Sequence, residues 1–456
     1  MNSRVVRVGG GSGMWGDDLD APRRLVEGGP LDYLILDYLA EVTMSVLQRQ
    51  KDRDPAAGYA RDIVGAVESV LPALIAKKIK IVANAGGVNP RACADAVLAM
   101  LDKVGARGTV KVALVSGDDL LARIDELLAA GHELRHMDSG APLSEVRARL
   151  VSANAYIGSA ALADALALGA DVVLCGRCND AALAVAPLRH EFGWKATDLD
   201  QLASATVAGH VIECGAQATG GNCSYDWRTI PDLANVGYPI VEVQADGSFV
   251  VTKHAGTGGR VSRQTVSEQL VYEIGDPRAY ITADVVSDFT TIQIAELGHD
   301  RVAISGVHGR APTGKLKVSA AYRDGFKAVG TLVYAWPDAR AKAEAAAGIL
   351  RARLDRLGLQ FEQVFTEIIG AGATHGPLAG PDAGCDAPEV QLRFGVRDAD
   401  RKKVERFTRE VAPLVLNGPP SVTGYFGARA KVEEILAYWP ALIEASVVTP
   451  RAELVP

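Results

Sequence analysis

The stretch KIKIVANAGGVNPRACADAVLAMLDK, residues 78–103, decides the fold class. A short apolar run ends in Asn84-Ala85-Gly86-Gly87, and Pro90 then opens an alanine-rich segment with helical spacing. A glycine-containing loop followed by Pro at the first helical position is typical of a strand that leads into a helix. A second apolar run, VKVALVS at 110–116, follows that helix. The stretch therefore predicts a βαβ unit with parallel strands.

Similar apolar runs alternate with helical segments on either side of this stretch, at 4–8, 31–39 and 171–176. We therefore expect an α/β fold in which residues 1–237 form a Rossmann-like parallel sheet wound by helices. The loops that follow parallel strands meet at one edge of the sheet. Four loops are expected to converge there on one cleft: 9–18, 84–89, 176–180 and 213–222.

The pattern changes after residue 237, and residues 238–456 are predicted to form an α+β domain. Three segments alternate apolar and polar residues about turn residues and predict hairpins: 241–253 with its turn at Asp246-Gly247, 290–306, and 316–335. Beyond them we expect a helix from Pro337 to Leu357, strands near Phe365 and Val390, and helices near Val404 and Val432.

The charge pattern bears on the class of partner. The formal net charge of −7 is spread without a basic block, so nucleic acid is a poor partner and a small molecule a better one. No apolar run is long enough to cross a bilayer and no signal region is visible, so a cytoplasmic location is expected. Six cysteines are scattered, and only Cys175 and Cys178 have suggestive spacing. We interpret this pair as packing residues rather than a redox pair.

The first loop, Gly11 to Gly16, matches G-x-G-x-x-G formally. Acidic residues follow it, and Pro22 marks the expected start of the helix, so carboxylates would face a pyrophosphate. We therefore do not expect a dinucleotide site. Asp18 is instead a candidate acid or base, with a solvated turn residue as the alternative.

Two further groups are candidates for proton transfer. Asp37 and Glu41 follow the second apolar run, where repulsion and burial would raise a carboxyl pKa; helix capping is an equal alternative. His210 and Glu213 lie in a segment with too little bulk for a core element. His210 could move a proton if Glu213 or Asp180 lies nearby, and a satisfied structural histidine is the alternative. The candidate catalytic residues are thus Asp18, Glu41, His210 and Glu213.

Glycine-rich and polar loops supply the candidate binding residues. In the stretch Thr257-Gly258-Gly259-Arg260, between a strand and a helix, backbone N–H groups and an arginine could hold an anion, or the stretch is only a turn. The expected substrate-binding residues are Gly11, Ser12, Asn84, Gly86, Gly87, Arg177, Asn179, Asp180, Gln217, Thr219, Gly220, Gly221, Asn222, Thr257, Gly258, Gly259 and Arg260.

Six blocks of the sequence also carry a resemblance: GGGSGMWGDD, VANAGGVNP, CGRCNDAAL, AGHVIECGAQATGGN, GTGGRVSRQTVSEQLVYEIGDP and LKVSAAYRDGF. With these blocks the chain resembles the acyclic terpene utilisation protein A family. The resemblance implies the degradation of branched terpenoid acids as coenzyme A thioesters, with a role in cleaving or hydrating a 3-hydroxyacyl-CoA. Many relatives end in a small ferredoxin-like domain, and we expect that piece as a separate small subunit here.

These observations predict a lyase or hydro-lyase that acts on a carboxylated small molecule, such as an acyl-CoA. The alternative is a non-catalytic subunit that binds an acyl-CoA or carboxylate for a larger complex. Coenzyme A is expected only as part of the substrate, and a divalent metal stays an open alternative. We expect a homo-oligomer, with neither nucleic acid nor a membrane as partner.

Overall fold

The computed structural model describes residues 4–424 and 430–456. The chain forms two compact units, of which the first comprises Met1–Ala321 with Tyr438–Pro456 and the second Tyr322–Ala437. The chain passes between them twice, within strands β14 (Lys315–Ala335) and β18 (Glu433–Glu444). The boundary expected near residue 237 falls inside the first unit.

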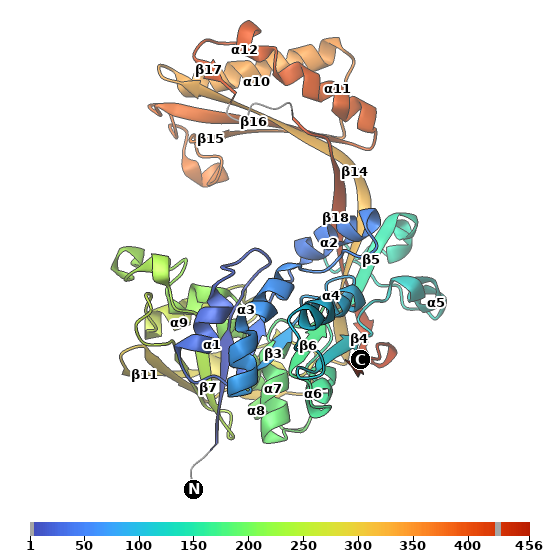
Figure 1. Cartoon of the computed structure of the whole chain (residues 1–456). Helices are drawn as coiled ribbons and strands as arrows, with labels where there is room; N and C mark the ends of the chain where they lie inside the picture. Colours follow the sequence, from blue (N-terminus) through green and yellow to red (C-terminus); the bar gives the residue numbers. More distant parts are fainter. Residues whose placement is uncertain (1–3, 425–429) are drawn as a thin grey trace. The chain divides into compact units, whose positions relative to one another are not determined.

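The first unit is built on a mixed ten-stranded sheet (Figure 1). In spatial order its strands are β11 (Gln293–Gly298), β12 (Arg301–Ser305), β8 (Phe249–Thr252), β7 (Ile240–Gln244), β1 (Val5–Gly10), β2 (Tyr33–Leu36), β3 (Lys80–Ala83), β6 (Val172–Cys175), β4 (Val112–Ser116) and β19 (Arg451–Val455). The five strands from β1 to β4 in this order run parallel, as predicted.

Antiparallel strands extend this parallel centre at both ends, which the prediction of a parallel sheet missed. The hairpins β7–β8 and β11–β12 join beside β1, and both hairpins were predicted from their turns. At the other end, β19 from the C-terminal segment pairs with β4. The fold is therefore mixed α/β, and a Rossmann-like winding stays a prediction.

Helices cover both faces of the parallel centre. On one face α1 (Ala21–Gly28), α3 (Asp62–Lys77) and α4 (Pro90–Lys103) enclose a core with alternate side chains of the strands, such as Leu34, Ile81 and Ala83. Successive strand residues point to opposite faces. The alternate residues Tyr33 and Ile35 are also buried, and α7 (Ala182–Phe192) contacts β1, β2 and β3.

The remaining helices of the first unit lie around these layers. They are α2 (Glu41–Arg53), α5 (Ile124–Ala129), α6 (Ala160–Ala167), α8 (Leu199–Ile212) and α9 (Arg263–Val271). A small antiparallel sheet of β9 (Tyr280–Ile281), β10 (Val286–Asp288) and β13 (His308–Arg310) packs on α8. Strand β5 (Leu150–Ala155) pairs with β14.

The second unit has the order β14, α10 (Ala339–Arg356), β15 (Gln363–Ile369), β16 (Glu389–Asp398), α11 (Arg401–Val411), α12 (Leu414–Asn417), β17 (Val422–Thr423) and β18. β14 and β15 flank β16 in antiparallel pairs, and β18 also pairs with β14. Apart from the short helix α12 and the strand β18, this order is β-α-β-β-α-β, which is that of a ferredoxin-like unit. The chain thus contains such a unit itself, and a separate subunit stays a prediction.

Two predictions in this region were wrong. Residues 316–335 form one long strand rather than a hairpin, because the segment up to Ala321 belongs to the first unit while Phe326–Ala335 pairs with β16. The two halves of β14 thus find partners elsewhere instead of each other. The helix expected near Val432 is strand β18 from Glu433 onward. The helix expected over 337–357 is confirmed as α10, and the helix near Val404 as α11.

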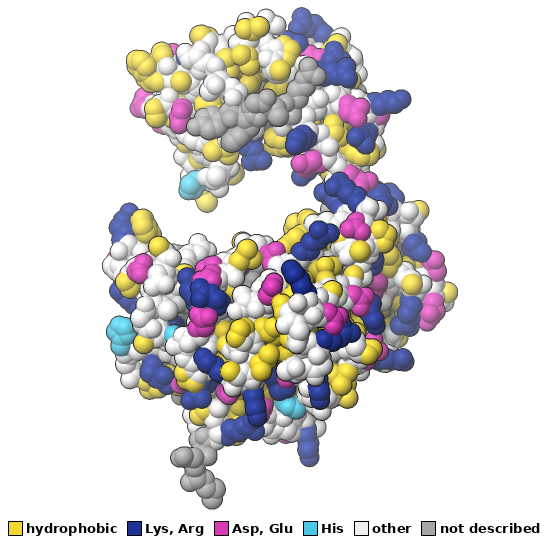
Figure 2. All heavy atoms as spheres, in the orientation of Figure 1, with side chains coloured by type: hydrophobic (Ala, Val, Ile, Leu, Met, Phe, Trp, Pro, Cys, Tyr) yellow, Lys and Arg dark blue, Asp and Glu magenta, His cyan; other side chains and the backbone are white. Residues whose placement is uncertain are grey.

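The surface carries charges of both signs. On the face shown in Figure 2, acidic and basic side chains are interspersed. No helix among the described residues is long and apolar enough to pass through a bilayer.

Candidate functional site

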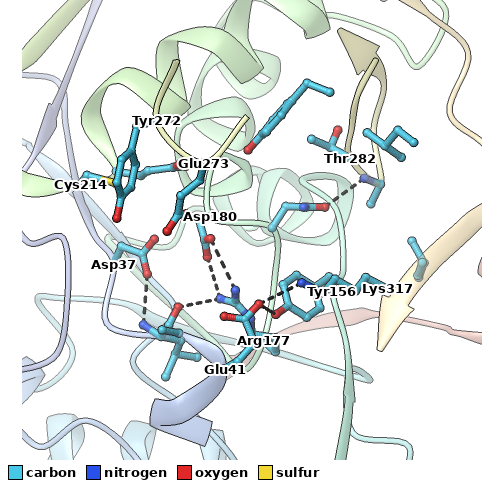
Figure 3. Close-up of a pocket in the computed structure, with 18 of the residues that line it drawn as sticks. Asp37, Glu41, Tyr156, Arg177, Asp180, Cys214, Tyr272, Glu273, Thr282 and Lys317 are labelled. Atoms are coloured by element: carbon cyan, nitrogen blue, oxygen red, sulfur yellow. Dashed lines mark hydrogen bonds and ion pairs between the residues drawn. The ribbon is translucent and has the colours of Figure 1, made fainter. Parts of the chain in front are cut away.

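A cavity of about 750 Å³ opens in the first unit where the loops after several parallel strands meet (Figure 3). Polar and charged side chains dominate one part of its wall: Asp37, Glu41, Tyr156, Arg177, Asn179, Asp180, Glu213, Cys214, Tyr272, Glu273, Tyr280, Thr282, Lys315 and Lys317. Parallel strands β1, β2 and β6 each send a following loop to it, as Gly13, Asp37 and Asn179 show. This is the edge at which open parallel sheets bind ligands.

Asp37 follows β2 directly and is only 4% exposed. Its Oδ1 accepts hydrogen bonds from Asn84 Nδ2 at 2.7 Å and from the Leu39 N–H at 3.1 Å. Burial and then the charge of Asp180 raise the pKa of Asp37 well above its ordinary value, although Arg177 and Asn84 oppose this. Its Oδ2 has no hydrogen-bond partner within the described parts of the chain. Asp37 therefore offers a protonatable oxygen at the cavity.

Arg177 lies in the loop after β6 and is 2% exposed. Its Nη1 donates to Asp180 Oδ1 at 2.7 Å and to the Leu39 carbonyl at 2.9 Å, and its guanidinium lies 4.1 Å from the ring centroid of Tyr156. Figure 3 shows this pair at the centre of the cavity wall. A buried cation needs this kind of pairing, because an unpaired one costs several kcal/mol. Of the three guanidinium nitrogens of Arg177, Nε has no hydrogen-bond partner among the described residues.

Glu41 begins α2 and contacts two residues of other elements. Tyr156 Oη donates to Glu41 Oε1 at 2.7 Å, and Lys317 Nζ donates to the same oxygen at 2.9 Å. Burial alone would raise the pKa of Glu41, but these two donors and the charge of Lys317 outweigh it and lower the pKa to about 2. The sequence predicted a raised pKa at this position. Glu41 is therefore a permanent anion that holds Lys317, which does not suit a general base.

His210 and Glu213 lie at the C-terminal end of α8, three residues apart and so on one side of the helix. His210 Nδ1 lies 2.9 Å from Glu213 Oε1. Glu213 lines the cavity and His210 does not. Burial raises the pKa of Glu213, and Asp180 and Glu273 add to this, while His210 lowers it. The predicted partnership of these two residues is therefore present, with Glu213 as the member that a ligand can touch.

Other predicted residues support the site from behind or lie away from it. Asn84 is fully buried and holds Asp37, and Ser12 Oγ donates to the Asp37 carbonyl at 3.0 Å. The N–H of Gly86 donates to the Cys175 carbonyl, and a side chain on Gly87 would meet Leu47 at 2.4 Å. These loops thus pack strand ends together.

Asp18 and Gly11 do not line the cavity. Asp18 is paired with Arg24 at the surface. A side chain at Gly11 would meet Leu34 at 2.7 Å, so this glycine allows β1 and β2 to pack closely. Asp18 is therefore a solvated turn residue, which is the alternative that the sequence left open.

The segment 215–222 contributes to a second cavity, of about 430 Å³, rather than to the first. Gln217, Gly221 and Asn222 line it, together with Tyr272 and Glu273, which line both cavities. Thr219 is buried and donates to the Gly237 carbonyl at 2.6 Å, so it fastens the segment internally. Of the four loops expected in one cleft, 9–18, 176–180 and 213–222 reach the first cavity through Gly13, Asn179 and Glu213.

The glycine loop at 256–260 lies elsewhere, and its backbone groups are occupied. The N–H of Gly258 donates to the Asn235 carbonyl at 2.8 Å, that of Gly259 to Pro231 at 2.7 Å, and that of Arg260 to Thr219 at 2.7 Å. The Arg260 guanidinium donates to the Thr229 carbonyl at 2.6 Å. These donors are therefore not free to bind an anion, and Thr257 likewise donates to the His254 carbonyl. The loop fastens chain segments in this structure.

Sequence reasoning missed several residues of the wall. Tyr156, Tyr272, Tyr280, Lys315 and Lys317 come from four separate segments. They form no local motif, although Tyr272 and Lys317 lie inside two of the blocks that carried the resemblance. Glu273 has a left-handed backbone with φ 57°, which is uncommon outside glycine and worth noting at a site.

Metal ligation was also left open by the sequence. Within residues 4–424 and 430–456, no group of three or more His, Cys, Asp or Glu side chains has an arrangement that could hold a metal ion. Cys175 and Cys178 are buried, with their sulfur atoms 3.8 Å apart.

The chain matches a model of a protein family. Residues 6–454 match the model described as acyclic terpene utilisation family protein AtuA, which spans nearly the whole chain. No curated protein and no solved structure matches the chain.

Proposed function

The chain belongs to the acyclic terpene utilisation family, which implies a role in acyclic terpene utilisation, and from this we propose that it is a lyase or hydro-lyase. Its substrate is a carboxylated small molecule of terpenoid-type degradation, such as a branched 3-hydroxyacyl-CoA or a hydroxy acid. One observation carries the proposal. Asp37 and Glu213 line the same cavity, and each keeps one carboxyl oxygen without a partner among the described residues.

Two such carboxyl groups suit the removal of water from a 3-hydroxyacyl compound. Glu213 as carboxylate takes the proton from the carbon beside the carbonyl. Asp37, which burial keeps protonated to higher pH, gives its proton to the leaving hydroxyl. A C–H and a C–O bond break, a C=C bond forms, and water leaves with the proton of Asp37. The reverse sequence adds water.

The charges elsewhere in the wall suit the anionic part of such a substrate. Lys315 and Lys317 line the cavity, and Figure 3 shows Lys317 on the other side of Arg177 from Asp37. A carboxylate or phosphate at these lysines would lie away from Asp37, and it would share Lys317 with Glu41. Arg177 is committed to Asp180, so its role is to hold that carboxylate in place.

The proposal is tested with purified protein and 3-hydroxyacyl-CoA or free hydroxy acids, with and without a divalent metal, by mass spectrometry. Loss or gain of water supports it. Asp37→Asn and Glu213→Gln should lower turnover about 10²–10⁴-fold, the usual contribution of an acid or base. Asp18→Asn, outside the cavity, is the control. Turnover by both cavity variants at the wild-type rate would overturn the assignment.

A non-catalytic binding subunit is the second candidate, and the apolar part of the wall favours it. Met14, Met137, Tyr272, Ile281 and Leu442 line the cavity and are each at least 40% exposed. Exposed apolar side chains gathered at one place are typical of a binding surface. This candidate predicts acyl-CoA binding by calorimetry without turnover, and binding that Asp37→Asn leaves intact.

A further inference from the structure

His210 is a buried histidine whose two ring nitrogens both have partners. It is 2% exposed, and Nε2 lies 2.9 Å from the Gln269 carbonyl while Nδ1 lies 2.9 Å from Glu213 Oε1. Tyr280 and Phe289 pack against the ring, with centroids at 5.5 and 5.6 Å. The ring therefore has no room to turn and no contact with the solvent.

The partners decide where the protons of this ring lie. A carbonyl oxygen only accepts, so Nε2 must carry a hydrogen. The second nitrogen then either donates to an ionised Glu213 or accepts from a protonated one. In both cases one proton lies between Nδ1 and Oε1, and the remaining question is which atom holds it.

Gln269 fixes the ring in place. Its side-chain Nε2 donates to the His210 carbonyl at 2.8 Å, so Gln269 contacts the histidine at both the ring and the backbone. Gln217 Nε2 donates to Gln269 Oε1 at 3.1 Å, and Asn222 Nδ2 donates to Gln217 Oε1 at 3.1 Å. Gln217 and Asn222, which the sequence marked as substrate-binding, thus orient the Gln269 amide. The chain of bonds ends at Glu213.

The charges that face this pair are mostly negative. Burial would lower the pKa of His210, but Glu213, the bond to Gln269 and the charge of Glu273 raise it above its ordinary value. Glu213 also faces Asp180 and Asp37, and Cys214 and Tyr280 are the other titratable groups beside it. The C-terminal end of α8 adds a partial negative charge, which favours a cation at His210.

We propose that His210 is a positioning residue that stays an imidazolium at neutral pH and thereby keeps Glu213 ionised, with Oε2 left without a hydrogen-bond partner in the wall of the cavity. Gln269 is its orienting partner. A carboxyl group this deeply buried would otherwise stay protonated, since burial disfavours the charged form. The role of Glu213 as base rests on the proposed function, whereas the protonation of His210 does not.

The protonation state is tested directly by ¹⁵N NMR of histidine-labelled protein between pH 6 and 8. His210 should show two protonated ring nitrogens across this range. In Glu213→Gln the same ring should revert to a neutral form with hydrogen on Nε2 only. The signal is assigned by its loss in His210→Asn, or, if that variant does not fold, by its shift in Glu213→Gln. A neutral ring in the wild type at pH 7 would overturn the proposal, whatever the protein catalyses.

The functional consequence is tested by the pH profile of turnover with a 3-hydroxyacyl-CoA. His210→Asn keeps a donor near Glu213 but removes the charge. The acidic limb of the pH profile should therefore move to higher pH by about 1–3 units, which is the pKa shift that a nearby opposite charge causes. His308→Asn, at an exposed histidine paired with Asp200, is the control and should leave the limb in place. A lower rate with an unmoved limb would show that His210 is only structural.

Discussion

Asn84 Nδ2 lies 2.7 Å from Asp37 Oδ1, and this hydrogen bond joins the residue after β3 to the residue after β2. Asn84 Oδ1 in turn accepts from the Tyr38 N–H at 2.8 Å, so the amide cannot rotate without losing a bond. The carboxyl group of Asp37 is therefore held on one side, and its second oxygen faces the cavity that Asp37 lines.

Asp37→Asn should stabilise the protein at neutral pH while it removes activity. Because the pKa of Asp37 is higher in the folded than in the unfolded chain, ionisation opposes folding as the pH rises above about 3.8. Each unit of raised pKa corresponds to about 1.4 kcal/mol. Urea unfolding at pH 8 and pH 4 checks this: the free energy of unfolding of the variant should exceed that of the wild type at pH 8 only. A less stable variant at pH 8 would contradict the buried, protonated state.

Arg177→Ala should lower the free energy of unfolding by about 3–5 kcal/mol, because it leaves Asp180 without its cation and removes a buried side chain. Arg23→Ala is a matched control: Arg23 also pairs with an aspartate three residues away, but at the surface. It should change stability far less than Arg177→Ala. Equal effects of the two substitutions in chemical denaturation would mean that the pair of Arg177 with Asp180 contributes no more to stability than a surface pair.

Gly259→Ala should destabilise the protein more than Gly256→Ala. Both glycines have a left-handed backbone, with φ 79° and 77°, which costs an alanine about 1–2 kcal/mol. A Cβ at Gly259 would also lie 2.5 Å from the Thr219 carbonyl oxygen, while at Gly256 it meets open space. The added clash should cost about 1–3 kcal/mol more. Ligand binding should change little in either folded variant, and a selective loss of affinity in Gly259→Ala would restore the anion-site interpretation.

Glu41→Gln should leave the pH profile of turnover in place and reduce stability by less than about 1 kcal/mol, because the pair with Lys317 is about one-third exposed. The pKa of Glu41 is lowered from 4.5 to about 2, so its contribution is present above pH 4.5 and is lost as the pH falls toward 2. Thermal melts at pH 7, 4 and 3 should show the two proteins converging. A shifted acidic limb in Glu41→Gln would make Glu41 a base after all.

Much of the site's framework could be predicted from the sequence. The runs at 33–36 and 81–83 are continuous and apolar, because their strands are buried on both faces, and each is followed by polar residues at the sheet edge. This placed Asp37, Arg177, Asp180 and Glu213 near one another. The sequence also named Glu213 as a possible partner of His210, and the spacing of three residues at the end of α8 brings the two together.

The electrostatic state of these residues could not be predicted in the same way. Glu41 and Asp37 are four residues apart and both follow β2, yet the pKa of one is lowered and that of the other raised. The difference comes from Lys317 and Tyr156, which lie 276 and 115 residues away from Glu41 in the chain. A pKa depends on which partners fold against the group, and no local pattern records them.

By itself the sequence determined the elements and the side of the sheet on which the polar loops gather, because periodicity and turn residues act over a few positions. Only the tertiary structure decided the rest. β19, from the far end of the chain, pairs with β4 at the edge of the sheet. The N–H groups of Gly258, Gly259 and Arg260 in the glycine loop donate to carbonyls of distant segments. Backbone hydrogen bonds must all be satisfied on burial, and which distant group satisfies them is settled only when the chain has packed.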